Sequence, residues 1–139
     1  MKLLEQVKFS CSVSSVQCKN IKQYGKQHMF DSCPDTSWNS SEGLPQWIII
    51  RFESPQAVSK FLFQFQGGFV AKTLSIIIQT EAGQQISEET FYPEDVNSPQ
   101  SFELQHPVKS KEATIVKILF PSSTDFFGRI ILYKLEILE

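Results

Sequence analysis

The chain has 139 residues, of which 41% are hydrophobic and 20% charged, a composition typical of a globular protein and not of a disordered one. A chain of this length can bury about two-thirds of its unfolded surface in one core, so residues 1–139 are predicted to form a single domain. The net charge of −2 and the pI near 5.7 disfavour a surface that wraps nucleic acid through positive charge.

Five segments have the residue pattern of β-strands. In chain order they are 47–52, 58–66, 74–80, 114–120 and 128–139. Successive side chains of a strand point to opposite faces, so alternating apolar residues predict one buried face. The predicted buried faces are Phe61, Phe63 and Phe65; Leu74, Ile76 and Ile78; Val116, Ile118 and Phe120; and Ile131, Tyr133, Leu135 and Ile137.

Turn-forming residues separate these segments. They lie at 53–55, 67–68, 82–83, 97–99 and 121–123, and they are rich in glycine, proline, serine and asparagine. Only about one turn of helix is expected, near residues 21–30. Short strands with regular turn punctuation predict an all-β fold, an antiparallel β-sandwich of the jelly-roll kind.

Cysteine content and apolar runs bear on the compartment. The three cysteines, Cys11, Cys18 and Cys33, are an odd number and cannot all pair within the chain. The N-terminal residues lack the apolar run of a signal peptide, and no stretch approaches the roughly 18 apolar residues that span a membrane. Reduced thiols in the cytosol or nucleus are therefore expected.

Short landmarks occur along the whole chain: VSSV (13–16), HMFD (28–31), DTSW (35–38), PQW (45–47) and GRIILYKLEILE (128–139). Their order and spacing resemble the discoidin family, also called coagulation factor five/eight type C domains. The resemblance implies a galactose-binding-like jelly roll. It also identifies Trp38 and Trp47 with the two tryptophans of the family, and both are expected to wedge between the sheets.

A closer resemblance is carried by FDSCPDTSWNS (30–40), FQGGF (65–69), FYPEDVNS (91–98) and TDFFGRIILY (124–133). These segments are similar to a family of small single-domain proteins described as associated with an orphan nuclear receptor. The resemblance implies a protein-binding module that represses transactivation by binding the receptor and opposing its binding to DNA response elements. It further implies residence in the nucleus, with the cytoplasm as a second location.

The loop FDSCPDTSW (30–38) has two interpretations. In many discoidin relatives the equivalent loop holds a structural calcium, and the resemblance would assign Asp31, Thr36 and Glu136 as ligands. Calcium takes about six to eight hard oxygen ligands, whereas Cys33 here places a thiol where an oxygen is expected. The alternative is a tight corner in which aspartate side chains accept backbone N–H bonds, with Trp38 beneath.

The loops expected at one end of the sandwich carry the candidate partner-binding residues. These are Phe69, Asp125, Phe126, Phe127 and Arg129, which combine aromatic bulk with charge as protein-contact hot spots do. The alternative is that Phe126 and Phe127 plug the core, with Arg129 solvated or paired to Asp125. Glu94 and Asp95, in the polar loop 91–100, are interpreted as solvated charges.

Catalysis has no support in the sequence. The only histidines, His28 and His106, lie far apart, and no nucleophile–base pattern, zinc-finger spacing or phosphate loop is present. The L-x-x-L-L motif that a nuclear receptor partner would suggest is also absent. We therefore expect a non-enzymatic monomer that contacts neither nucleic acid nor membrane directly and needs no cofactor. The alternatives are a calcium-bearing carbohydrate- or lipid-binding module, or a jelly-roll subunit of a larger intracellular complex.

Overall fold

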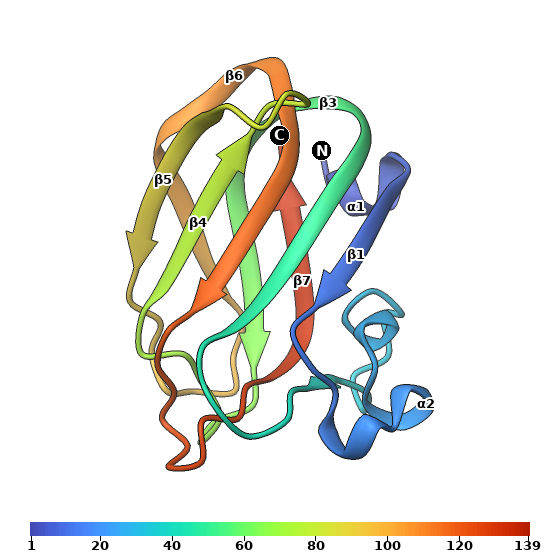
Figure 1. Cartoon of the computed structure of the whole chain (residues 1–139), viewed down its shortest axis with the longest axis vertical. Coiled ribbons are helices and arrows are strands. Elements are labelled where there is room, and N and C mark those ends of the chain that lie inside the picture. Colours follow the sequence, from blue (N-terminus) through green and yellow to red (C-terminus); the bar gives the residue numbers. More distant parts are fainter.

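A computed structural model describes residues 1–139 and shows antiparallel strands with short helical turns near the N-terminus (Figure 1). The strands are β1 (Phe9–Val13), β2 (Trp38–Asn39), β3 (Gln46–Phe65), β4 (Leu74–Gln79), β5 (Gln85–Phe91), β6 (Gln100–Phe120) and β7 (Ile131–Leu138). The helical turns are α1 (Leu3–Gln6), η1 (Gln17–Lys19), α2 (Ile21–Tyr24) and η2 (Lys26–Met29). The predicted all-β class is confirmed. None of the helices has the length and apolarity needed to cross a bilayer.

Two long strands, β3 and β6, connect the two layers of the sandwich. The first part of β3 pairs with β1 and with the last part of β6, which also pairs with β4, and β5 follows β4 at the edge. The second part of β3 pairs with β7 and with the start of β6. The turn predicted at 53–55 is wrong, because β3 continues through it. Pro55 lies at a register shift, where a missing N–H is tolerated.

Aromatic rings from both layers meet in the core. Phe61, Phe63 and Phe65 are fully buried and stack along β3, with centroid separations of 6.3 and 5.8 Å. Phe120 of β6 presents its edge to Phe63 and Phe65 at 6.5 and 6.0 Å. Trp38 packs 6.3 Å from Phe120 and is also fully buried. Edge-to-face aromatic pairs add about 0.5–1.5 kcal/mol each beyond the burial of their area.

Two predicted core positions are wrong. Trp47 is only half-buried, because it lies on the opposite face of β3 from the buried Ile48. In β7, Leu135 and Ile137 face the core as predicted, but a register shift opposite Gln64 and Phe65 changes the face of the residues that precede them. As a result Ile130 and Leu132 join the core and Tyr133 is only half-buried, whereas Ile131 is buried as predicted.

Thr114 of β6 offers a test of the core. It is fully buried, and its hydroxyl has no hydrogen-bond partner. A buried hydroxyl without a partner costs about 1–3 kcal/mol, so the nearly isosteric Thr114→Val is expected to raise the free energy of unfolding by about 1 kcal/mol. Urea unfolding measures this change. Thr114→Ser is the control, because it keeps the hydroxyl, loses a methyl and should destabilise; a Val variant no more stable than the parent would contradict the argument.

Candidate functional site at the loop rim

Loops gather at the lower end of the sandwich in Figure 1, and we call them the rim: residues 14–20, 40–45, 66–73, 92–99 and 121–130. Backbone hydrogen bonds join loops that are distant in sequence. The N–H of Thr124 donates to the carbonyl of Val70 at 2.8 Å, and that of Gly43 donates to the carbonyl of Phe127 at 2.8 Å. The rim is therefore a single connected surface.

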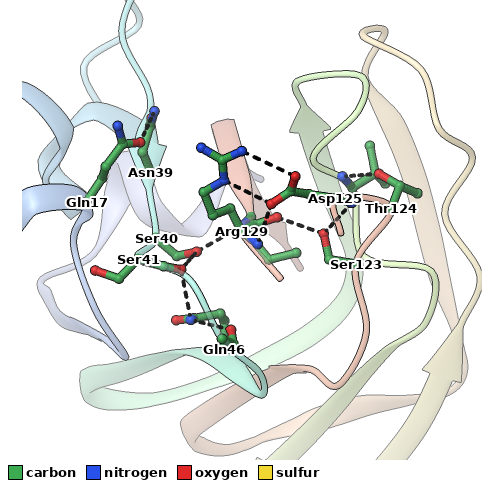
Figure 2. A network of polar contacts seen from close by, with 12 residues as sticks. Gln17, Asn39, Ser40, Ser41, Gln46, Ser123, Thr124, Asp125 and Arg129 are labelled. Carbon is green, nitrogen blue, oxygen red and sulfur yellow. Dashed lines mark hydrogen bonds and ion pairs between the residues drawn. The ribbon is translucent and has the colours of Figure 1, made fainter. Parts of the chain in front are cut away.

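Asp125 and Arg129 form the charged centre of the rim (Figure 2). The carboxylate of Asp125 accepts from Nε of Arg129 at 2.9 Å, from Nη2 at 3.3 Å and from the backbone N–H of Arg129 at 3.0 Å. These bonds from Arg129 outweigh partial burial and lower the pKa of Asp125, while the carboxylate raises the pKa of the guanidinium. Both groups are therefore charged at neutral pH. The alternative in which Arg129 pairs with Asp125 is thus confirmed.

Two phenylalanines flank this ion pair, and a third packs against one of them. The guanidinium carbon of Arg129 lies 5.1 Å from the ring centre of Phe69 and 5.7 Å from that of Phe127, within the range of cation–π attraction. Phe126 packs edge-on against Phe127 at 5.3 Å. Phe126 is 93% exposed and Phe127 53% exposed, so the alternative in which both plug the core is wrong. The structure thus brings all five candidate partner-binding residues together.

Gln46 holds the neighbouring part of the rim and was not identified as a site residue from the sequence. Its side chain is buried, yet both of its amide atoms are satisfied. The amide nitrogen donates to the carbonyls of Ser41 and Gly43 at 3.1 and 2.7 Å, and the amide oxygen accepts from the hydroxyls of Ser14 and Ser15. The PQW landmark and the VSSV landmark are therefore in direct contact, a relation that spacing alone does not reveal.

Ser40 connects the same network to the charged centre (Figure 2). Its hydroxyl accepts from the N–H of Ile130 at 2.9 Å, and its own N–H donates to the carbonyl of Ile130 at 2.9 Å. Gly128 makes a close approach nearby, with φ +80°, and a Cβ there would lie 2.9 Å from Leu44 and 3.1 Å from the Gly43 backbone. Only glycine fits at position 128.

A shallow cavity opens beside Arg129. It has a volume of about 480 Å³ and is lined by Gln17, Cys18, Ser41, Glu42 and Arg129. The lining therefore supplies both hydrogen-bond donors and acceptors, together with one charge of each sign. Such a cavity suits a small polar ligand.

The loop 92–99 supports the glycine turn at 67–68. The carboxylate of Asp95 accepts from the N–H of Gly68 at 2.8 Å, and the side-chain oxygen of Asn97 accepts from the N–H of Gly67 at 2.7 Å. Asp95 is exposed, as the interpretation as a solvated charge expected, but it also supports this turn. Its sequence distance from the turn it supports, 27 residues, explains why no local pattern identified it.

The residues assigned to calcium lie in two separate hydrogen-bonded groups. Asp31 accepts from the hydroxyl of Thr36 at 2.6 Å and from the N–H of Cys33 at 2.9 Å, and it faces Nδ1 of His28 at 3.1 Å. Desolvation raises the pKa of Asp31, but these three hydrogen bonds together lower it. Glu136 instead pairs with Lys134 at 3.0 Å and with Lys2 at 3.5 Å.

This arrangement does not fit calcium. Asp31 accepts hydrogen bonds on both oxygens, Glu136 is paired with two lysines, and Cys33 offers a thiol where calcium takes an oxygen. No group of three or more His, Cys, Asp or Glu side chains is arranged to hold a metal ion. The geometry matches the tight corner that was the alternative interpretation of this loop.

Known proteins resemble this chain over most of its length. Residues 10–131 match the model of the F5/8 type C domain. A protein of Danio rerio named nuclear receptor 2C2-associated protein is 45% identical over 127 residues, which cover 91% of this chain and 87% of that protein. The Homo sapiens protein of the same name is 41% identical over 128 residues, covering 91% of this chain and 88% of that protein.

Solved structures support the same architecture. An F5/8 type C domain from Bacteroides fragilis superposes with a TM-score of 0.75 at 16% identity, covering 93% of this chain and 89% of that one. A family 32 carbohydrate-binding module of Clostridium perfringens NanJ, solved in complex with galactose, gives a TM-score of 0.72 at 19% identity, covering 94% and 93%. These likenesses establish the fold, and the family and fold are those of binding modules. The chain belongs to the F5/8 type C domain family and, within it, to the nuclear receptor 2C2-associated proteins.

Proposed function

We propose that this protein binds a nuclear receptor of the 2C2 kind through its rim and represses transactivation without catalysing a reaction. The name of the relatives supports the choice of partner. The rim supports the choice of surface, because a single loop there presents aromatic rings and a fixed ion pair to solvent. The protein acts as a monomer in the nucleus.

The exposed ring of Phe126 is the observation that carries this proposal. It is 93% exposed, although exposing a large apolar ring to water is unfavourable. The loop beneath it is held by the Asp125–Arg129 pair and by the Ser123 hydroxyl, which donates to the carbonyl of Arg129 at 2.7 Å. Binding therefore costs little ordering of the loop, and a pre-organised aromatic beside an arginine is the usual composition of a hot spot.

The proposed mechanism of repression is steric. The sandwich is rigid, since its layers are joined by β3 and β6, and it would cover the part of the receptor that contacts DNA. The chain's own net charge of −2 gives it no general attraction to the DNA phosphates. Receptor bound to this protein would therefore be unable to occupy its response element.

A second candidate function uses the cavity beside Arg129. Its polar lining and volume of about 480 Å³ suit a small sugar or another polar ligand, and the NanJ module, which shares the fold, was solved in complex with galactose. Calorimetric titration with galactose separates this candidate from receptor binding. Heat of binding that is lost in Arg129→Gln would support it.

The first prediction concerns Phe126. Replacing it with alanine removes an exposed ring and leaves the ion pair in place, so the affinity for nuclear receptor 2C2 should fall about 30-fold, the effect of losing one hot spot of about 2 kcal/mol. Biolayer interferometry with the full-length receptor measures the change. Tyr92→Ala is the matched control, since Tyr92 is 72% exposed in a different loop of the rim. We call Phe126 and Phe127 the aromatic tip of the rim. Unchanged affinity in a Phe126→Ala/Phe127→Ala double variant would contradict receptor binding through this tip.

The second prediction concerns repression. Adding the protein to receptor on a fluorescent response-element duplex should lower the anisotropy of the DNA, because bound receptor leaves it. Phe126→Ala should raise the concentration of this protein that releases the receptor from DNA, by the same factor by which it weakens binding to the receptor. A larger complex that contains DNA, receptor and this protein would contradict the steric mechanism while leaving receptor binding intact.

The third prediction concerns metal. We propose that the loop 30–38 keeps its shape through hydrogen bonds alone. The Tm should therefore be the same in excess calcium as in EDTA. If the loop bound calcium, a calcium concentration of about 100 times the Kd would instead add about 2.7 kcal/mol to the free energy of unfolding. Asp31→Asn is the control, and it should lose about 1 kcal/mol equally with calcium and with EDTA. A Tm that rises with calcium in the parent but not in this variant would restore the metal.

A further inference from the structure

The strand β1 lies at an edge of the sandwich and pairs only with β3 (Figure 1). The register of this pair is antiparallel and runs from Phe9 opposite Phe52 to Val13 opposite Ile48. One side of β1 is thus engaged in the sheet. Its other side meets no strand.

The register identifies which backbone groups of β1 are free. Ser14 donates its N–H to Trp47 at 3.0 Å, and Glu53 donates its N–H to Lys8 at 3.0 Å. In an antiparallel ladder the hydrogen-bonded pairs alternate, so Ser10 and Ser12 also face β3. The N–H and carbonyl groups of the residues between them, Phe9, Cys11 and Val13, therefore point away from β3 along the open edge.

The residues of β1 lack the usual protection against pairing, although the α2–η2 segment lies beside its Val13 end. Exposed edges commonly carry charged residues or proline, or are very short. Two other free edges follow this rule, since β5 contains Glu88 and Glu89 and β2 has only two residues. In contrast, β1 reads FSCSV and contains neither a charge nor a proline. Burial raises the pKa of the Cys11 thiol to about 12, so it is also neutral.

A cavity lies beside the last residues of β1. It has a volume of about 310 Å³ and lies between β1 and the α2–η2 segment, lined by Ser12, Val13, Val16, Ile21, Gly25 and Lys26. Three of its walls are aliphatic, and Ile21 is 64% exposed. Lys26 is its only charged group, and its positive charge acts on Cys11 in the middle of β1.

We propose that β1 accepts an extended segment of another protein, which adds a strand to the sheet. The backbone of that segment bonds to Phe9, Cys11 and Val13, as in other complexes formed by strand addition. An aliphatic side chain of the segment enters the cavity beside Val13, and an acidic side chain faces Lys26. This surface is separate from the aromatic tip of the rim, so the proposal does not depend on receptor binding there.

The charge of Lys26 favours a foreign segment over a second copy of this chain. Two copies paired through β1 would bring two positive charges to one short strand pair, and like charges across strands are destabilising. Lys8, which precedes β1, would add a further charge of the same sign on each copy. An acidic segment instead meets complementary charge.

Nuclear magnetic resonance with a defined peptide tests the proposal. The probe is the capped hexapeptide Thr-Asp-Val-Thr-Val-Thr, added to the full chain up to about 2 mM, a range that detects millimolar Kd values. The amide protons of Phe9, Cys11 and Val13 should shift downfield and exchange more slowly, whereas those of Ser10 and Ser12 should change little. A copy of the peptide that is N-methylated at alternate amides should have no effect.

A charge exchange supplies the matched variants. Lys26→Glu should lower the affinity for the acidic peptide about fivefold and raise the affinity for a copy that carries lysine in place of aspartate. Lys22→Glu is the control, because Lys22 is exposed on the same helical segment but does not line the cavity. The proposal is overturned by the absence of any response at Phe9, Cys11 and Val13, by an equal response to the methylated peptide, or by equal effects of the two variants. Dimerisation through β1 in sedimentation would assign the edge to a second copy and overturn it too.

Discussion

The contact of Phe63 and Phe65 with Phe120 supports everything built at the rim. These rings come from different long strands, and their edge-on packing fixes the two layers relative to each other. Phe65 is the last residue of β3, and Phe120 is the last residue of β6. The loops 66–73 and 121–130 therefore leave the sandwich from adjoining points of the rigid core, which is why their side chains can meet.

Buried polar bonds then fix the loops in one arrangement. Gln46 and Ser40 are buried, and an unpaired amide or hydroxyl at such positions would cost about 1–3 kcal/mol. Their bonds to Ser41, Gly43 and Ile130 reach across the rim, so any displacement of one loop would break several of them. The exposed rings above are thus presented by a pre-organised surface, which lowers the entropy lost when a partner binds.

How much the sequence could predict depended on the range of the interaction. Alternation of apolar residues predicted the buried faces of β4 and of the second part of β3, because a period of two is a local property. The polar strand β5 and the first part of β6 lack that alternation and were missed. Pro55 suggested a turn, but sheet pairing on both sides kept the chain extended. The core change in β7 followed a register shift that only its partner strand determines.

The candidate site shows the same division. The composition of 124–129 identified aromatic and charged residues that do meet, because they lie within one loop. Their exposure was not predictable, since a phenylalanine has the same sequence signature in a core and at a surface. The roles of Gln46 and Asp95 depend on contacts across about 30 residues, beyond any local motif.

We propose that hydrogen bonds close the loop 30–38 without a metal. A metal would bring oxygen ligands together by charge, whereas here one carboxylate collects neutral and positive donors from Thr36, Cys33 and His28. His28 also places Nε2 at 2.9 Å from the carbonyl of Lys22, so both of its ring nitrogens face acceptors. An imidazolium satisfies both at once, and the hydrogen bonds to Asp31 and Lys22 raise the pKa of His28. A protonated ring places its positive charge beside Asp31, the carboxylate that the resemblance assigned to calcium, which supports the proposal that this corner closes without a metal.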